Sequence, residues 1–197
     1  MPRPQVHQTD TILDVTRDLL LEDGARAATI EAVGEASGAP TGSIYHRFGS
    51  RDELLARLWI RAVYRSQASF LDALETSDAK EAALAGAMAI ISFCEEHPED
   101  AKLLVSFRRE DLMLRAPEGA LAEELAELNE PILRAVVDLA RRLYGRRTRA
   151  ALDRTLLAVF DLPYGAARRH LIAGSRFPAG LKADVARAVT AVIEEPL

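Results

Sequence analysis

The sequence predicts an all-α protein of about nine helices, in which three short helices precede a bundle of longer ones. Apolar residues recur at intervals of three and four along most of the chain, which is the spacing of one helix face. Ala and Leu dominate the composition, followed by Glu and Arg, and these residues favour helix over strand. No alternating apolar and polar run bounded by turns is present, so the sequence contains no strand signal.

The first three helices are expected to be short. Residues 1–8 hold two prolines and no apolar period, and we interpret them as a mobile arm. A stripe that starts at Ile12 predicts a helix over residues 9–21. Thr29 is expected to cap a helix over about 30–37, and a third helix is expected over about 40–47.

Six longer helices follow, and a capping box opens the first of them. Ser50 is the capping residue, and Glu53 stands three positions later. Prolines should interrupt the later helices, with Pro98 at a break and with Pro131 and Pro163 at kinks. The expected spans are about 50–74, 80–96, 98–110, 120–144, 148–172 and 179–194.

The stretch GAPTGSIYHRF, residues 38–48, has the glycines and hydroxyls of a loop that binds phosphate. A nucleotide P-loop needs a strand and the pattern GxxxxGK[ST], but Gly38 and Gly42 stand one residue too close and no Lys follows. A helix-turn-helix fits better, because two short helices flank a turn that contains glycine. Such turns also serve packing alone, so these residues by themselves leave a DNA-binding unit and a structural turn open.

In a DNA-binding unit, the helix over 40–47 would enter the major groove by its leading end. Its first residues are small or carry hydroxyls, so that end could approach base edges, and its last residues could meet phosphate oxygens. The candidate DNA-binding residues are Thr29, Thr41, Gly42, Ser43, Tyr45, His46, Arg47 and Arg51.

Short motifs follow one another in a fixed order between Thr11 and Leu55. They are Ile12-Leu13, Glu22-Asp23-Gly24, Ala28-Thr29-Ile30, Val33-Gly34, Ser37-Gly38, Gly42-Ser43-Ile44-Tyr45, Phe48-Gly49-Ser50 and Glu53-Leu54. In this order and spacing the segment resembles the DNA-binding domain of the TetR (tetracycline-repressor) family of bacterial regulators.

Three positions depart from the pattern of that family. Pro40 offers no capping oxygen at the start of the recognition helix. Arg47 stands where His or Tyr is common, so a phosphate contact is retained. Gly34 replaces the usual Ala, which permits closer helix contact but weakens the helix.

The resemblance implies a ligand-responsive transcriptional regulator, in the commoner mode a repressor, that binds a palindromic operator as a homodimer. It implies a helix-turn-helix domain over residues 1–50 and a domain for ligand binding and dimerisation over 51–197. Residues that could line the ligand site, although aromatic residues fill cores more often, are Trp59, Phe93, His97, Phe107, Met113, Phe160, Tyr164 and His170. Lone amphipathic helices more often pack within one chain, but a dimer is favoured because one short recognition helix reads too few bases. Residues that could form the dimer interface are Leu152, Leu156, Val159, Leu181, Val185, Ala188, Val189 and Val192.

The charge of the chain is unusual for a protein that binds DNA. The formal net charge is −5, and residues 1–60 carry six Arg, no Lys and nine acidic residues. No acidic residue lies between Gly38 and Arg51, so a local basic edge is available to phosphates. We therefore expect DNA binding with a modest dependence on salt.

Other classes of protein receive little support. One cysteine, Cys94, excludes an internal disulfide framework, and no cluster indicates a catalytic residue, a metal site or a cofactor. The polar N-terminus and the short apolar runs predict a cytoplasmic protein, at the nucleoid when bound to DNA, with no membrane partner. The alternative to a regulator is a helical protein that binds a small molecule or a protein partner without binding DNA.

Overall fold

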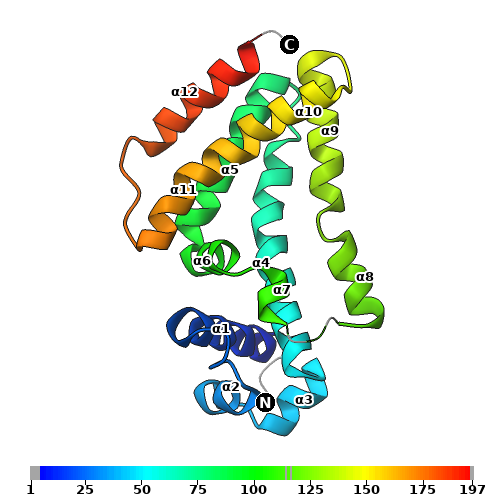
Figure 1. The fold of residues 1–197 in the computed structure, drawn as a ribbon, viewed down its shortest axis with the longest axis vertical. Helices are drawn as coiled ribbons and strands as arrows, with labels where there is room; N and C mark the ends of the chain where they lie inside the picture. Colours follow the sequence, from blue (N-terminus) through cyan, green and yellow to red (C-terminus); the bar gives the residue numbers. More distant parts are fainter. Residues whose placement is uncertain (1–4, 114, 116, 196–197) are drawn as a thin grey trace. The chain divides into compact units, whose positions relative to one another are not determined.

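The structure, a computed structural model, is built from helices throughout its described part, which confirms the all-α prediction (Figure 1). It describes residues 5–113, 115 and 117–195, without the side chains of residues 5–7, 111 and 112. In chain order the helices are α1 (Gln5–Asp23), α2 (Ile30–Ser37), α3 (Thr41–Phe48), α4 (Arg51–Ala73), α5 (Ala79–Glu96), α6 (Pro98–Ser106), α7 (Arg109–Leu112), α8 (Gly119–Glu127), α9 (Glu130–Tyr144), α10 (Arg149–Leu156), the π-helix η1 (Leu157–Asp161), α11 (Leu162–Ala173) and α12 (Leu181–Glu194).

The first helix begins earlier than the sequence predicts. α1 starts at Gln5, so the interpretation of residues 1–8 as a mobile arm is wrong for residues 5–8, while residues 1–4 lie outside the described residues. Both prolines of that segment precede Gln5. The helix can therefore extend back from Thr9 without losing a backbone hydrogen bond to proline.

Prolines divide the later helices in three different ways. α5 ends at Glu96 and α6 starts at Pro98, as expected. The expected kink at Pro131 is a complete break, because α8 ends at Glu127 and α9 starts at Glu130.

The expected kink at Pro163 takes the form of a π-helix. Because Pro163 has no N–H, the regular helical hydrogen bond from that position cannot form. The turn before it widens, and the N–H of Leu162 donates to the carbonyl of Leu157, five residues earlier. Inserted π-turns of this kind are a recognised cause of helix bending.

The chain divides into two compact units. Unit 1 comprises the residues up to Val63 together with Lys102–Glu127, and unit 2 comprises Tyr64–Ala101 together with the residues from Leu128 onward. α4 contributes residues to both units. Among the described helices, none combines the length and the apolar character needed to cross a membrane.

The core of unit 1 combines the first four helices with a distant segment. Ile12, Ile44 and Leu58 are fully buried in it, and so is Leu103 of α6. Phe107, which follows α6, packs against the same core and is partly buried. Side chains of Leu103, Leu104, Phe107 and Met113 therefore complete the core that holds α1, α2 and α3.

Unit 2 has a separate core, formed around α5. α11 and α12 lie beside α5, as Figure 1 shows in orange, red and green. Small residues on α5 allow close packing: a Cβ atom on Gly86 would lie 2.9 Å from the Cδ2 atom of Leu74 and 3.3 Å from Cε2 of Phe70. α4 and α5 are therefore in direct contact here.

Candidate nucleic-acid interface

The helix-turn-helix of unit 1 is formed by α2 and α3. The hydroxyl of Thr29 accepts a hydrogen bond of 3.1 Å from the backbone N–H of Ala32, which confirms the predicted N-cap. Ile30 and Val33 are buried and anchor α2, and Gly38 caps its C-terminal end with a φ of 69°, in the left-handed region. Thr29 thus has a structural role at the start of α2, besides its candidacy for DNA binding.

Gly34 allows α2 and α3 to approach closely. A Cβ atom at this position would lie 3.1 Å from the carbonyl oxygen of Ala39 and 3.2 Å from Cγ2 of Thr41. Both atoms belong to the turn and the first residue of α3. The glycine therefore helps to set the position of α3 on α2.

α3 is anchored by two side chains and presents the others outward. Ile44 and Phe48 are buried in the core of unit 1, four residues apart on one face. Pro40 precedes the helix and supplies no side-chain cap, as its chemistry predicts. Its carbonyl oxygen accepts hydrogen bonds from the N–H groups of Ser43 at 2.8 Å and Ile44 at 3.2 Å.

The leading end of α3 is slender and open. Thr41 and Gly42 are exposed, Ser43 is half-buried, and no atom lies within 4 Å of the position where a Cβ atom on Gly42 would stand, leaving aside its chain neighbours and the helix backbone. Tyr45 follows with 49% of its surface exposed, and His46 is exposed as well. These five candidates lie together on α3, where the sequence analysis expected them.

The two candidate arginines have different environments. Arg47 is half-buried at the end of α3 and donates hydrogen bonds to side chains of α1. The guanidinium of Arg51 donates to the carbonyls of Ala28, at 2.9 Å, and Ala25, and forms an ion pair with Asp52. Arg51 therefore holds the connection between α1 and α2, and its role as a phosphate contact stays a prediction.

A capping box fixes the turn from α3 to α4. The N–H of Glu53 donates to the hydroxyl of Ser50 at 3.2 Å, as predicted. Gly49 precedes it with a φ of 80°, and a Cβ atom there would lie 2.8 Å from a carboxylate oxygen of Glu53. Another residue at position 49 would be strained and would also displace this carboxylate.

The candidate ligand residues are divided between the two units. Trp59, Phe107 and Met113 pack against the core of unit 1. In unit 2, Phe160 stacks on Tyr164 with ring centroids 5.9 Å apart, and His170 contacts Ser175 at 3.0 Å. Trp59, Phe107 and Met113 thus follow the general tendency of large apolar side chains to fill cores, whereas Phe160 is 41% exposed.

The end of α5 holds the two remaining candidates beside the cysteine. The ring of Phe93 is buried and lies 5.5 Å from that of His97, which is exposed. Cys94 is 7% exposed, and burial together with the charge of Glu95 raises the pKa of its thiol to about 11. The thiol is therefore protonated and unreactive at neutral pH.

The expected dimer residues mostly belong to the core of unit 2. Their regular apolar stripe faces inward, because a strongly amphipathic helix buries its apolar face in its own domain first. Their role at an interface between two chains stays a prediction. Val159, Leu181, Val185 and Val189 are buried, Leu152, Leu156 and Val192 pack against the same core, and Ala188 is half-buried.

A different apolar surface is exposed on the helix formed by α10, η1 and α11. Leu157, Phe160 and Ile172 are 43%, 41% and 55% exposed, and they account for half of the large hydrophobic side chains that are exposed in the described part of the chain. We call these three residues the outer apolar face. Leu157 and Ile172 are not among the dimer residues that the sequence predicts, and Phe160 is among the predicted ligand residues.

The segment that contains the helix-turn-helix matches a known protein family. Residues 12–58 match the model of the family described as bacterial regulatory proteins, tetR family. They form a TetR-family domain. This domain contains α2, α3 and the start of α4, so the family match covers the slender end of α3.

Solved structures extend the similarity to nearly the whole chain. The TetR-family regulator PfmR from Thermus thermophilus is 20% identical, with a TM-score of 0.67 over 94% of this chain and 98% of its own. FadR from Bacillus subtilis, solved in complex with stearoyl-CoA, is 14% identical, with a TM-score of 0.69 over 95% and 98%. The ketosteroid regulator KstR2 of Mycobacterium tuberculosis is 18% identical, with a TM-score of 0.63 over 94% and 93%.

These similarities show that the chain has the fold of TetR-family transcriptional regulators. Among curated protein sequences, none matches this chain significantly.

Proposed function

We propose that the protein is a ligand-responsive transcriptional repressor that binds a palindromic DNA operator as a homodimer. The observation that carries this proposal is the open leading end of α3 in a TetR-family domain. Thr41 and Gly42 are exposed there, and the surface beside Gly42 is empty. An end of this shape fits a helix that approaches base edges in a major groove.

The glycine at position 42 has no evident role in the fold. Its backbone is helical, its φ is not positive, and a side chain would meet no neighbour. Glycine in a helix also reduces stability by up to about 1 kcal/mol relative to alanine. The missing side chain is explained if the backbone of α3 must come close to another molecule, such as DNA.

A homodimer follows from the size of the reading element. α3 has eight residues, and one such helix contacts too few base pairs for useful specificity. Two copies related by a twofold axis would read two half-sites about 34–36 Å apart. We propose that the outer apolar face supplies the contact between the copies, because three large apolar side chains are exposed along one continuous run of helix.

The effector would be a small molecule bound in unit 2. Two proteins of similar fold are connected with small molecules by name: FadR was solved in complex with stearoyl-CoA, and KstR2 is a ketosteroid transcriptional regulator. α4 has residues in both units of this chain, so it offers a covalent route from effector to α3. The effector would favour one conformation of the dimer and thereby change its affinity for DNA.

The proposal is tested by selecting bound fragments from random double-stranded DNA and then measuring affinity in a shift assay. Wild-type protein should enrich a palindrome, and Tyr45→Ala should weaken binding to it. Tyr64→Ala is a matched control, because Tyr64 of α4 is 46% exposed against 49% for Tyr45. The control should bind the palindrome like wild type.

Two results would contradict the proposal. Wild-type protein that enriches no sequence would favour a helical protein that binds small molecules or partners without DNA. Equal affinities of the Tyr45 and Tyr64 variants would show that α3 is not the contact surface.

A further inference from the structure

We infer that the first turn of α1 positions Arg47 for the DNA backbone, with Gln8 and Thr9 as the positioning residues. This inference rests on the proposed function, and it adds a role for two residues of α1 in DNA binding. It is drawn from the contacts that the end of α3 makes within unit 1.

Arg47 is held by two acceptors from α1. Its Nη1 atom donates to the hydroxyl of Thr9 at 2.9 Å, and its Nη2 atom donates to the side-chain oxygen of Gln8 at 3.3 Å. Both acceptors are neutral, so they orient the guanidinium without cancelling its charge. These bonds use two of its five N–H donors and leave it able to meet a phosphate oxygen.

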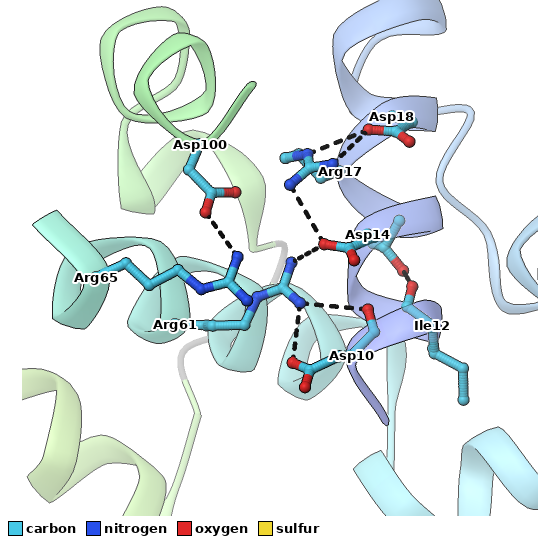
Figure 2. Close-up of polar contacts among 9 residues, drawn as sticks. Asp10, Ile12, Asp14, Arg17, Asp18, Arg61, Arg65 and Asp100 are labelled. Atoms are coloured by element: carbon cyan, nitrogen blue, oxygen red, sulfur yellow. Dashed lines mark hydrogen bonds and ion pairs between the residues drawn. The ribbon is translucent and has the colours of Figure 1, made fainter. Parts of the chain in front are cut away.

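The turn that holds Arg47 is itself held by α4. Arg61 donates to both the backbone carbonyl and the carboxylate of Asp10 at 3.2 Å, directly after Thr9 in the chain. It also donates to the carboxylate of Asp14 at 2.7 Å (Figure 2). The side chain of Arg61 is only 12% exposed, whereas those of Asp10 and Asp14 are 47% and 43% exposed, so the arginine is fixed while water still reaches the carboxylates.

The ion pairs of Arg61 also neutralise carboxylates of α1 close in sequence to Thr9, a residue that holds Arg47. Asp10 and Asp14 are the carboxylates of α1 nearest to Thr9 in sequence, and Arg61 pairs with both. Figure 2 shows Arg17 bound to Asp14 as well. The acidic first half of α1 therefore does not need Arg47 as its counter-ion, and the positive charge of Arg47 can serve a phosphate.

Preorganisation explains why this matters for binding. A free arginine has many rotamers, and fixing such a side chain at an interface costs about 0.5–1.5 kcal/mol. Bonds to Gln8 and Thr9 restrict the side chain before DNA arrives. Loss of this restriction should weaken DNA binding by about two- to tenfold while the charge of Arg47 remains.

A double-mutant cycle on the selected operator tests the inference. Thr9→Val removes the acceptor at nearly constant shape, Thr9→Ser restores it, and Gln8→Ala removes the second acceptor independently. Each is measured alone and combined with Arg47→Ala, by DNA affinity at several salt concentrations. Arg47→Ala should lower the salt slope by about 1, as expected for one lost phosphate contact.

The expected result is non-additivity. Thr9→Val and Gln8→Ala should weaken binding in the wild-type background and have no further effect in the Arg47→Ala background, and Thr9→Ser should bind like wild type. Equal losses in both backgrounds would overturn the inference, because Gln8 and Thr9 would then act without Arg47.

Thermal unfolding separates positioning from a structural role. If Arg47→Ala lowers the Tm but leaves DNA affinity and its salt slope unchanged, the contact only joins α1 to α3, and the inference is overturned. Failure of wild-type protein to bind any DNA would instead overturn the proposed function, and the inference with it. If wild-type protein binds the operator and the Thr9→Val and Gln8→Ala variants bind it equally well, the inference is overturned and the proposed function is not.

Discussion

Two glycines of the helix-turn-helix lack a side chain for different reasons. At Gly34, a Cβ atom would lie 3.1 Å from the carbonyl oxygen of Ala39, so the fold itself requires a small residue. At Gly42, the same atom would meet nothing within the chain. Only the second glycine is left without an explanation inside the molecule, and it stands on the surface that we propose to face DNA.

This difference predicts that Gly42→Ala separates stability from function. The variant should unfold at an equal or higher denaturant concentration, with a gain of up to about 1 kcal/mol, because alanine favours helix. It should bind the operator more weakly, because the added methyl group keeps the α3 backbone away from the groove.

Urea unfolding and shift assays on the same preparation measure both effects. An alanine variant that binds DNA as tightly as wild type would show that a slender end is not required. The comparison needs no further control, since stability and affinity are expected to move in opposite directions.

At this scale the sequence predicts residue types at the site better than their partners. The small residues of α3 and the basic end at Arg47 could be foreseen from the order of amino acids. Arg51 could not, because its partners are the carbonyls of Ala25 and Ala28, more than twenty positions away. Backbone carbonyls occur at every residue, so sequence carries no signal for such a contact.

Individual helices were largely predictable, because their signals are local. Thr29 and Ser50 cap the helices that follow them, and both caps depend on residues only three positions apart. The spacing of apolar residues was less informative about what each helix packs against. The stripe containing Val185 and Val189 shows that one face of α12 is buried, but periodicity does not distinguish the chain's own core from a second chain.

The break between α8 and α9 depends on a residue from α4. Gln67 is 7% exposed, and its amide nitrogen donates to the carbonyl of Leu128 at 2.9 Å and to the side-chain oxygen of Asn129 at 3.3 Å. Pro131 lies just beyond the break. Gln67 therefore satisfies a buried carbonyl at a point where the helical ladder is interrupted.

We predict that Gln67→Met lowers the free energy of unfolding by about 1–3 kcal/mol, because a buried acceptor would lose its donor at nearly constant side-chain volume. Asn129→Ala is the control and should have a smaller effect, since Asn129 is exposed. Urea unfolding of both variants gives the comparison. A Gln67→Met variant as stable as wild type would mean that the carbonyl finds another donor.

At the scale of the whole molecule, unit 1 is discontinuous in sequence. Leu103 is fully buried in the same core as Ile12 and Ile44, although about ninety residues separate Leu103 from Ile12. Reading along the chain favours contiguous domains, so this contribution could not be foreseen. We propose that the helix-turn-helix depends on Leu103, Leu104, Phe107 and Met113 for its stability.

The proposed dimer predicts a specific effect of charge on the outer apolar face. Ile172→Lys should shift the protein towards monomer, because burial at the contact would desolvate the charged ammonium group of the lysine. It should leave the Tm of the monomer nearly unchanged, since Ile172 is 55% exposed. Analytical ultracentrifugation over a range of concentrations measures the shift.

Leu133→Lys is the matched control for that experiment. Leu133 is 53% exposed but lies on α9, away in sequence from the outer apolar face. The control should sediment like wild type. If both variants, or neither, change the sedimentation, then the outer apolar face is not the contact between copies.

Burial of Cys94 has a practical consequence for work in solution. With a thiol pKa of about 11, only about one molecule in ten thousand carries a thiolate at pH 7. Maleimide reagents should therefore not label Cys94 in the native protein. A cysteine introduced at an exposed position of α3 can then accept a spin label without removal of Cys94. Pulsed electron paramagnetic resonance can measure the distance between the two labels of the proposed dimer, with and without operator.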